Sequence, residues 1–512
     1  MALPPNLPRV CACIGHADAG RAEALALASC AHGEALVELR IDALADPGRG
    51  PGIVEGVAAR HPSAFVLATC RRRQNSGGFD GTVSDQLALL RRAADRGARI
   101  VDVEIETLEA APGALEPFRG RCLTVASYHD FEQTGPLDPV VRRLEATGAD
   151  ILKVATRVNR PTDNLALLDL CRARRNMVVA GMGEEGSVAR LVSPQRGGLF
   201  TYAAPDSYRW PTDGPGGETV SAGPTAPGQV SARAARLLYR IPSGSEATGV
   251  YAVIARPVGH SLSPLIHNRA FEAVSFDGIY VPLLVRPSHV RDFFDLARRL
   301  PLSGASVTIP HKQAVIPLLD SVDETAREIG AVNTIYWHRG QLAGTNTDAR
   351  GIVSPLLKRT PLDGATVLVV GNGGAAKAAV TALRQEGCRV SVTGRNPARV
   401  GRLAREHGAR PLDFADATGR SFDILVQATP VGMTPAVDGN LFPGRVPAKI
   451  VFDLVYNPLE TVLLRHAADQ GRTVISGIEM FVEQAAEQFR IWTGIEAPRA
   501  VMRDALLAHK VK

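Results

Sequence analysis

A single lysine lies inside the short apolar run from Ala149 to Thr156, and its position suits covalent chemistry with a carbonyl group. Such a run is typical of a buried parallel strand, where the loss of water disfavours the charged form of Lys153 and favours a free amine. A free amine on a rigid strand can form a Schiff base with a ketone. The alternative is that Lys153 extends to water at the strand end and has no chemical role.

Two further residues could complete an acid–base set with this lysine. Glu104 ends one apolar run, and His129 follows another in Ser127-Tyr128-His129-Asp130. A carboxylate beside an imidazole raises its basicity, and a lysine imine acidifies the neighbouring C–H bond. Together the three favour proton abstraction next to a carbonyl group, and hence elimination, isomerisation or aldol cleavage. The structural alternatives are a helix cap for Glu104 and a buried core histidine for His129.

Arginines stand near the ends of other apolar runs in the same half of the chain. They are Arg40, Arg71 and Arg190. Because a guanidinium group binds a carboxylate with two parallel hydrogen bonds, these residues predict an anionic substrate.

The elements that position these residues form a repeating pattern of strand and helix. Helical patterns such as Ser84–Gly97 separate the apolar runs, and eight units in about 240 residues predict a TIM barrel with reactive side chains at the C-terminal strand ends. A doubly wound open sheet is the alternative. The runs that predict strands are Val10–Ile14, Ala35–Ile41, Ala64–Thr69, Arg99–Glu104, Arg121–Ser127, Asp150–Ala155, Met177–Ala180 and Leu199–Ala203.

Motifs around these residues resemble type I 3-dehydroquinate dehydratase over roughly residues 8 to 240. The matching pieces are Val37–Asp42, Ser127–Phe131, Leu152–Ala155 and Ala226–Gln229. The resemblance implies that Lys153 forms the Schiff base, that His129 acts as base and then as acid, and that Glu104 orients His129. It further implies that Arg190 binds the substrate carboxylate. The substrate pocket would consist of Glu38, Arg40, Arg71, Arg190, Thr225 and Gln229.

The chain departs from this family at two places. Thr225 stands where the family usually has serine, and Pro205–Gly223 is a Gly/Pro-rich insertion into the preceding loop. We expect a loop there, followed by a helix over Ser231–Tyr239. The polar stretch Arg240–Ser245 is the expected connector to the second half.

The second half contains another candidate acid–base pair, Lys312 and Asp348, with Asn333 and Thr308 as hydrogen-bonding companions. As a surface ion pair, Lys312 and Asp348 would contribute little to stability. Two serines precede a helix that has Pro264 in its first turn, and this arrangement suits a carboxylate. They are Ser261 and Ser263; the alternative role for Ser263 is a plain helix cap.

A glycine-rich turn follows the apolar strand Ala365–Val370. The turn, Gly371-Asn372-Gly373-Gly374-Ala375-Ala376, matches G-x-G-x-x-G/A between a strand and a helix, which is typical of a dinucleotide-binding Rossmann fold. The next strand, Arg389–Thr393, leads into Arg395 and Arg399 instead of an acidic residue. These arginines suit a 2′-phosphate, so the sequence favours NADP over NAD.

These motifs resemble shikimate dehydrogenase over roughly residues 248 to 512. Further matching pieces are Ala428–Met433, Asp453–Pro458 and Gly477–Gln484. The resemblance implies that Lys312, with Asp348, transfers the proton, and that the substrate lies among Ser261, Ser263, Thr308, Asn333, Asp348, Tyr456 and Gln484. It implies a cofactor site made of Gly371, Gly373, Gly374, Ala375, Arg395, Asn396, Arg399, Thr429, Met433 and Gly477. Ser306, Ala349 and Gln427 replace the family's usual Asn, Gly and Asn.

Composition narrows the remaining function classes. The 512 residues carry a net charge of +6 and are 45% hydrophobic, as expected for several globular domains that bind small anions. Seven cysteines without CxxC spacing predict a reducing compartment and no metal site, and His260 and His267 have no ligand spacing. Cys11, Cys13, Cys70 and Cys122 are expected to fill the core. We expect a cytoplasmic protein with no nucleic-acid or membrane partner and an undetermined oligomeric state.

The two resemblances fit one another, because one reaction makes the substrate of the other. They imply dehydration of 3-dehydroquinate to 3-dehydroshikimate, followed by NADPH-dependent reduction to shikimate. The expected domains are a barrel at 1–241, a substrate-binding domain at 248–348, a Rossmann domain at 349–475 and C-terminal helices at 476–512 that pack back on the substrate-binding domain. The alternatives are a non-catalytic quinate or shikimate sensor and a quinate-metabolising, NAD-dependent enzyme.

Overall fold

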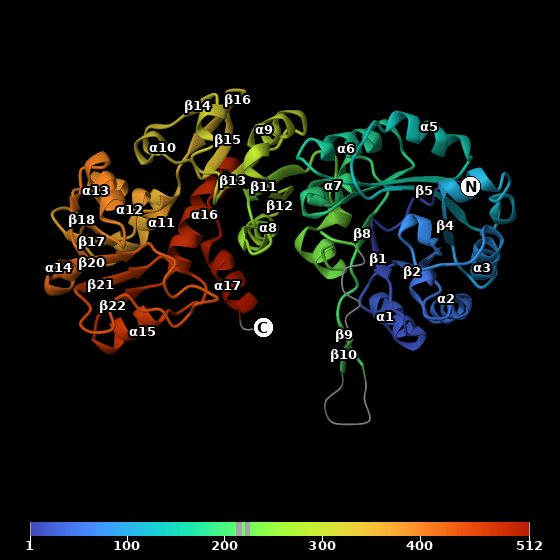
Figure 1. Ribbon diagram of the computed structural model, residues 1–512, viewed down its shortest axis with the longest axis horizontal. Helices are drawn as coiled ribbons and strands as arrows, with labels where there is room; N and C mark the ends of the chain where they lie inside the picture. The colour runs from blue at the N-terminus through green and yellow to red at the C-terminus, as the bar shows by residue number, and fades with distance from the viewer. Residues whose placement is uncertain (1, 211–217, 221–225, 511–512) are drawn as a thin grey trace. The chain divides into compact units, whose positions relative to one another are not determined.

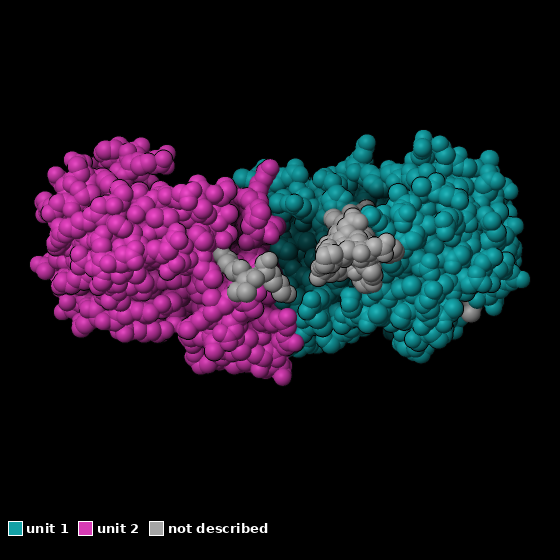
Figure 2. Space-filling view, turned by 90° about the horizontal axis from the view of Figure 1, so that it is seen from below, with its two compact units in different colours: residues 1–250, 277–302 teal, residues 251–276, 303–512 magenta. Residues whose placement is uncertain are grey.

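The computed structural model describes residues 2–210, 218–220 and 226–510 and divides into two compact units. Unit 1 comprises residues 1–250 and 277–302, and unit 2 comprises residues 251–276 and 303–512 (Figure 2). The expected connector Arg240–Ser245 lies in unit 1, where Ile241–Ser243 forms a 3-10 turn and Ile241 is fully buried.

Unit 1 contains a parallel barrel of eight strands in the order β7-β6-β5-β4-β3-β2-β1-β8. The two end strands approach each other where the backbone N–H of Leu199 donates a 2.9 Å hydrogen bond to the carbonyl of Met177, so the barrel is nearly closed. The predicted barrel is confirmed, and the alternative of an open doubly wound sheet is wrong. The strands are β1 (Val10–Ile14), β2 (Leu36–Arg40), β3 (Phe65–Thr69), β4 (Ile100–Glu104), β5 (Leu123–Asp130), β6 (Ile151–Arg157), β7 (Met177–Met182) and β8 (Thr201–Ala203).

Helices surround the strands of the barrel (Figure 1). The sequence of the third helix explains its position. Thr82 and Asp85 form a capping box that starts the helix, and Leu87, Leu90 and Ala93 recur at helical spacing on its buried face. The helices of the barrel are α1 (Ala19–Ala31), α2 (Gly50–Arg60), α3 (Val83–Asp95), α4 (Ile105–Ala110), α5 (Asp138–Ala146), α6 (Asp163–Ala173) and α7 (Ser187–Val192).

The insertion Pro205–Gly223 contains two short strands instead of the plain loop that the sequence suggests. Strands β9 (Tyr208–Trp210) and β10 (Glu218–Val220) pair antiparallel. Thr225 lies outside the described residues. The helix expected at Ser231–Tyr239 is a short π-helix over Ala234–Leu238.

Unit 1 also includes the later segment Asp277–Leu302, which carries β12 (Gly278–Leu284) and α9 (Val290–Arg299). Arg286 of this segment donates hydrogen bonds of 3.0 and 2.7 Å to Glu185, in the turn before α7. The backbone N–H and hydroxyl of Thr162 both donate to Asp292 of α9, at 2.7 and 2.8 Å. The segment therefore packs against the C-terminal side of the barrel.

Unit 2 begins with strands that lie side by side in the order β11-β13-β15-β16-β14. They are β11 (Gly249–Ala255), β13 (Gly304–Val307), β14 (Ser321–Val322), β15 (Thr334–His338) and β16 (Gln341–Thr345). The indole of Trp492 donates to the carbonyl of Ile335, which fixes a C-terminal helix on β15. The helices of this part are α8 (Ser263–Ala273), α10 (Glu324–Ile329), α11 (Asp348–Leu357), α16 (Gly477–Thr493) and α17 (Arg499–Lys510).

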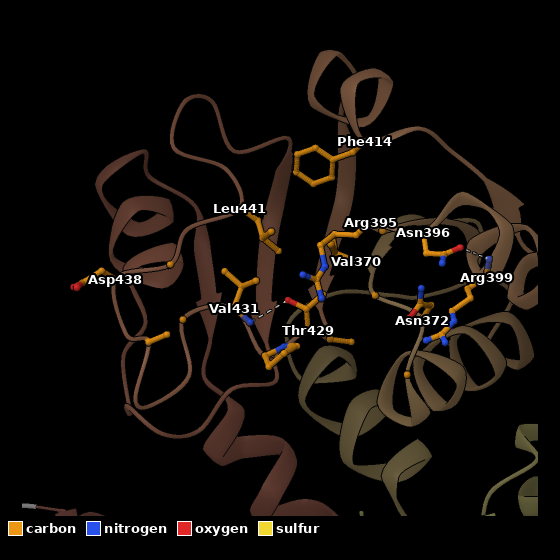
Figure 3. Close-up of a pocket in the computed structure, with 18 residues that line it drawn as sticks. Val370, Asn372, Arg395, Asn396, Arg399, Phe414, Thr429, Val431, Asp438 and Leu441 are labelled. Carbon is orange, nitrogen blue, oxygen red and sulfur yellow. Dashed lines mark hydrogen bonds between the residues drawn. The ribbon is translucent and has the colours of Figure 1, made fainter. Parts of the chain in front are cut away.

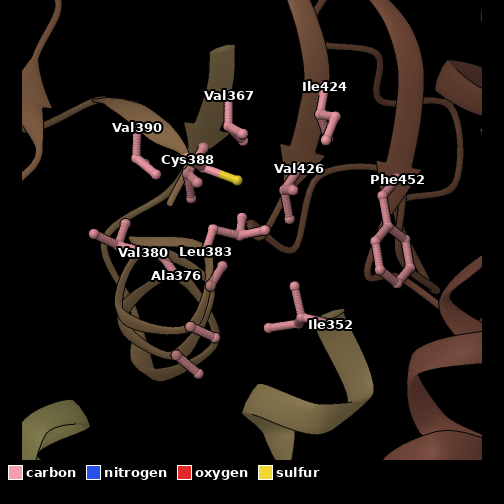
Figure 4. Packing of buried hydrophobic residues seen from close by; sticks show 14 of the residues in the cluster. Ile352, Val367, Ala376, Val380, Leu383, Cys388, Val390, Ile424, Val426 and Phe452 are labelled. Atoms are coloured by element: carbon pink, nitrogen blue, oxygen red, sulfur yellow. The ribbon is translucent and has the colours of Figure 1, made fainter. Parts of the chain in front are cut away.

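The rest of unit 2 is a parallel sheet in the order β19-β18-β17-β20-β21-β22, the arrangement of a Rossmann-type fold. Val380 and Leu383 of one helix pack against Val367, Ile424 and Val426 of the sheet in a buried apolar core (Figure 4). The elements are β17 (Thr366–Val370), α12 (Gly374–Gln385), β18 (Arg389–Thr393), α13 (Pro397–Glu406), β19 (Arg410–Pro411), α14 (Phe414–Gly419), β20 (Phe422–Gln427), β21 (Ala448–Asp453), α15 (Val462–Asp469) and β22 (Thr473–Ile475). Within the described ranges, no helix is long and apolar enough to cross a bilayer.

Candidate active sites

Lys153 lies inside the barrel, on β6, with 4% of its surface exposed. Its Nζ donates a 2.8 Å hydrogen bond to Oδ2 of Asp102 on β4 and lies 4.4 Å from the centre of the Tyr202 ring. The alternative of a lysine that extends to water is therefore wrong, and Lys153 has a buried counter-ion that the sequence did not reveal.

His129 and Ser127 point to the same face of β5, and the register places Ser127 opposite Lys153. Burial lowers the pKa of His129 well below its usual value, and the charges of Arg71, Lys153 and Arg40 lower it further. At neutral pH the imidazole is therefore uncharged and can accept a proton.

Glu104 ends β4 and is almost fully buried. Its carboxylate accepts hydrogen bonds from the side chain of Gln86, at 2.8 Å, and from the backbone N–H of Arg72, at 3.1 Å. Burial raises the pKa of Glu104 despite these donors. In the part of the chain that the structure describes, no hydrogen bond joins Glu104 to His129.

Arginines reach the same end of the barrel. Arg190 is 3% exposed, Nε and one terminal nitrogen have no hydrogen-bond partner among the described residues, and burial lowers its pKa to about 10. Buried donors without acceptors are costly, so this guanidinium suits an anionic ligand. Arg71 is also buried, 4.0 Å from Glu104. Arg40 instead makes a bidentate contact with Asp42, at 2.9 and 2.7 Å.

Glu38 faces the barrel interior from β2. It accepts hydrogen bonds from Thr69, at 2.7 Å, and from the thiol of Cys13. Cys13 lies in the buried apolar core of the barrel, as expected, and its thiol also contacts Glu38. Gln229 lies on the segment after the insertion, and its side-chain oxygen accepts a hydrogen bond from the backbone N–H of Ala226.

The second site lies in unit 2. Lys312 donates a short hydrogen bond to Oδ2 of Asp348, and Asn333 donates to Oδ1 at 2.8 Å. Asp348 begins α11, and its backbone N–H donates to Oδ1 of Asn346. The carboxylate is thus held from both sides while Lys312 keeps part of its surface open to water.

The residues expected around the substrate occupy several elements of unit 2. Ser261 accepts a hydrogen bond from the backbone N–H of Ser263, which starts α8, so the side chain of Ser263 is not the helix cap. Thr308 follows β13. Tyr456 stacks on Phe481 at 4.8 Å.

A glutamine that the sequence did not single out organises this site. Gln488 on α16 accepts a 2.8 Å hydrogen bond from Ser306 and donates to the hydroxyl of Thr334 and the carbonyl of Asn333. Gln484, one turn earlier, donates to the carbonyl of Phe481. The hydroxyl of Ser306, which replaces the family's asparagine, therefore serves to bind Gln488.

A cavity of about 1250 Å³ opens at the carboxyl ends of β17, β18 and β20 (Figure 3). Gly371, Gly373, Arg395, Asn396, Arg399 and Thr429 are among its lining residues. Gly371 has a φ of +130°, and a Cβ there would lie 2.8 Å from the carbonyl of Ala428, so only glycine fits this turn. The cavity suits a dinucleotide with a phosphate near the exposed arginines.

Four other residues expected at the cofactor are not among the residues that line this cavity. Gly374 and Ala375 form the first turn of α12, directly after the glycine turn. Met433 is exposed in the loop after β20, and a Cβ on Gly477 would lie 2.4 Å from the carbonyl of Val455.

Asp453, buried at the end of β21, is a second residue that the sequence did not identify as part of a site. It accepts hydrogen bonds from Thr461, Gln427 and the backbone N–H of Val455. Burial raises its pKa to about 6 despite these donors. Gln427 also donates to the carbonyls of Thr429 and Val431, so this pair holds the loop that lines the cavity.

Four family models match stretches of this chain. Residues 10–246 match type I 3-dehydroquinase, and residues 253–335 match the shikimate dehydrogenase substrate binding domain. Residues 356–437 match shikimate / quinate 5-dehydrogenase, and residues 477–507 match the shikimate 5′-dehydrogenase C-terminal domain.

Known proteins similar to this chain cover one or both halves. The bifunctional 3-dehydroquinate dehydratase/shikimate dehydrogenase of Arabidopsis thaliana, a chloroplastic protein, is 33% identical over 91% of this chain and 79% of its own length. An NADP(+) shikimate dehydrogenase of Oleidesulfovibrio alaskensis is 44% identical over 50% of this chain and 95% of its own. A crystal structure of a shikimate dehydrogenase in complex with NADP+ matches 52% of this chain and 98% of its own, with 33% identity and a TM-score of 0.50.

Proposed function

Because this chain belongs to the bifunctional 3-dehydroquinate dehydratase/shikimate dehydrogenase family, we propose that its two sites catalyse consecutive steps with the residues described above. The family's reactions are the dehydration of 3-dehydroquinate to 3-dehydroshikimate and the reduction of that ketone to shikimate. The observation that carries the proposal is that each unit holds its own lysine paired with a buried carboxylate, beside groups that suit the expected ligand.

In the dehydration, Lys153 attacks the ketone of 3-dehydroquinate and forms a Schiff base. The uncharged His129 then removes the proton next to the imine carbon and returns a proton to the departing hydroxyl, which leaves as water. The under-partnered guanidinium of Arg190 binds the substrate carboxylate, and Arg71 adds positive charge nearby. Glu38, Arg40 and Gln229 complete the pocket, and Glu104 supports it through Gln86.

In the reduction, the cavity lined by Gly371, Gly373, Arg395 and Arg399 would hold NADPH, which would supply a hydride to the ketone carbon of 3-dehydroshikimate. Lys312 donates a proton to the developing alkoxide, and Asp348 holds that ammonium in place. Ser261, Ser263, Thr308, Asn333, Tyr456 and Gln484 orient the substrate. Arg395 and Arg399 at the cavity favour NADP over NAD because they suit a 2′-phosphate.

Two alternatives to this function make different predictions. A non-catalytic sensor would have no use for a paired lysine in each unit, and a quinate-metabolising enzyme would prefer NAD. None of the seven cysteines, all within the described residues, forms a disulfide, which favours a reducing compartment, and we propose a cytoplasmic location on that basis.

One experiment tests both steps together. The purified chain is incubated with 3-dehydroquinate and NADPH, and the product is identified by mass spectrometry and by chromatography against shikimate. Shikimate formation at catalytic rates is expected. Accumulation of 3-dehydroshikimate would leave only the first reaction, unchanged 3-dehydroquinate would support the sensor, and turnover of quinate with NAD in preference would support the third alternative.

A further inference from the structure

The Schiff-base lysine has a partner to which the family resemblance gives no role. Asp102 precedes Glu104 by two residues on β4, so both carboxylates point into the barrel, with Asp102 one layer deeper. The side chain of Asp102 is fully buried, and Oδ2 lies 2.8 Å from Nζ of Lys153. Oδ1 accepts a hydrogen bond of 2.5 Å from Ser127, so both oxygens are held.

The groups that contact Nζ favour a positive charge on that nitrogen. Burial alone would raise the pKa of Asp102, but the charges of Lys153 and Arg71 and the hydrogen bonds from Lys153 and Ser127 outweigh it and lower the pKa. The carboxylate is therefore ionised. The face of the Tyr202 ring, 4.4 Å away on β8, adds a second contact that stabilises a cation.

An ammonium ion cannot attack a ketone, whereas the iminium ion that results carries the same positive charge on the same nitrogen. The pocket thus stabilises the positive charge that Nζ carries both before and after imine formation. Between these two states a proton must leave Nζ. Asp102 is the base in contact with that proton, since its oxygen accepts the hydrogen bond from Nζ.

We propose that Asp102 is a catalytic residue of the dehydratase, which shuttles the proton during imine formation and then serves as the counter-ion of the iminium. This inference rests on the proposed Schiff-base reaction. Asp102 takes one proton from the Lys153 ammonium, and the neutral amine forms a C–N bond to the ketone carbon. A second proton moves from that nitrogen to the ketone oxygen, which becomes a hydroxyl as the C=O double bond becomes single. Asp102 returns the proton to that hydroxyl, the C–O bond breaks, water leaves, and a C=N bond forms beside the restored carboxylate.

The test follows the covalent step directly. Wild type and Asp102→Asn are mixed with 3-dehydroquinate, the imine is trapped with borohydride, and the mass increase on Lys153 is followed in time across a range of pH. We expect the trapping rate of the variant to fall about 100-fold or more near neutral pH, the usual size of a lost acid–base group. We also expect a rate that rises with pH, because solvent must then remove the proton.

The matched control is Asp150→Asn, which makes the same change in the same barrel. Asp150 precedes β6 and accepts hydrogen bonds from the backbone and hydroxyl of Thr124, away from Nζ. Its trapping rate should stay within a few-fold of wild type. Calorimetric binding of 3-dehydroshikimate and ketone reduction by the same chain report whether each variant is folded.

A second variant, Asp102→Glu, keeps a charge in the barrel and guards against a folding defect in Asp102→Asn. Its longer side chain moves the carboxylate relative to Nζ, so trapping should also slow. Trapping at the wild-type rate and with the wild-type pH profile, in either variant, overturns the role of Asp102. Absence of trapping in wild type would instead refute the Schiff-base function itself.

Discussion

Asn333 donates a 2.8 Å hydrogen bond to Oδ1 of Asp348, the carboxylate whose other oxygen binds Lys312. Asn333 in turn is fixed by Thr347, whose backbone N–H donates to its side-chain oxygen at 2.8 Å. Both oxygens of Asp348 are therefore held by hydrogen bonds, and the contact with Lys312 directs the lysine ammonium toward this carboxylate.

The first prediction concerns that lysine. Lys312→Ala should lower the rate of 3-dehydroshikimate reduction by about 100-fold or more, because the alkoxide loses its proton donor. The rate is measured from the decrease in NADPH absorbance. Dehydration of 3-dehydroquinate by the same variant serves as the control and should be unchanged, since Lys153 lies in the other unit; loss of both activities would contradict the assignment.

The second prediction concerns the choice of cofactor. Arg395 and Arg399 line the exposed edge of the cavity, and the backbone N–H of Arg399 donates to the helix cap Asn396. Arg395→Asp combined with Arg399→Ala should reduce kcat/KM for NADPH by at least 10-fold more than for NADH, because the 2′-phosphate loses its charge partners. Arg405→Ala, on the same helix but outside the lining of the cavity, is the control. Equal losses with both cofactors would refute a 2′-phosphate site.

The third prediction concerns the pH dependence of dehydration. Burial and the charges of Arg71, Lys153 and Arg40 hold the pKa of His129 well below its usual 6.5. The base form of His129 therefore persists as the pH falls through 6.5, and the acid limb of the kcat profile should lie below that pH. Initial rates between about pH 4.5 and 8 measure it. If the midpoint of the acid limb lies at or above pH 6.5, the base that titrates there is not a His129 with a lowered pKa.

The fourth prediction concerns stability in unit 2. Burial lowers the pKa of His267 to about 3, against a hydrogen bond with Gln488 that raises it. The unfolded chain gains this proton near pH 6.5 and the folded chain only near 3, so unfolding is favoured as the pH falls through that interval. The free energy of unfolding should decline by about 1.4 kcal/mol per pH unit from this residue.

Urea denaturation of wild type and His267→Asn between about pH 4 and 7.5 measures this dependence. The difference between the two curves isolates His267 from the carboxylates, and the exposed His260→Asn is the control with no expected change. Parallel curves for wild type and His267→Asn would rule out a buried neutral imidazole.

Much of the fold could be predicted because strands and helices leave local patterns. The apolar run at Val10–Ile14 matches β1 residue for residue. Strand β5 extends to Asp130, three residues beyond the predicted end, because Tyr128-His129-Asp130 is polar yet still pairs with β6. Polar residues in a strand weaken the apolar signal, and one of these three, His129, shares the face of Ser127 that points into the barrel.

The pairing of Asp102 with Lys153 could not be predicted from the sequence alone. The two residues are 51 positions apart, and their contact depends on the stagger of three neighbouring strands, which periodicity does not specify. The signal that did exist is the alternation of Asp102 and Glu104 on one strand. The contacts of Gln488 could not be predicted for a similar reason, because its partners Ser306 and Thr334 lie more than 150 positions earlier in the sequence.

The placement of residues 277–302 in unit 1 has a consequence for any attempt to separate the two halves of the chain. A truncated chain that ends near residue 246, where the first family match ends, would lack Arg286 and Asp292 and leave Glu185 and Thr162 without their partners. Glu185 stands in the turn before α7, which carries Arg190. A free-standing dehydratase cut at that point should therefore bind its substrate more weakly than the full chain.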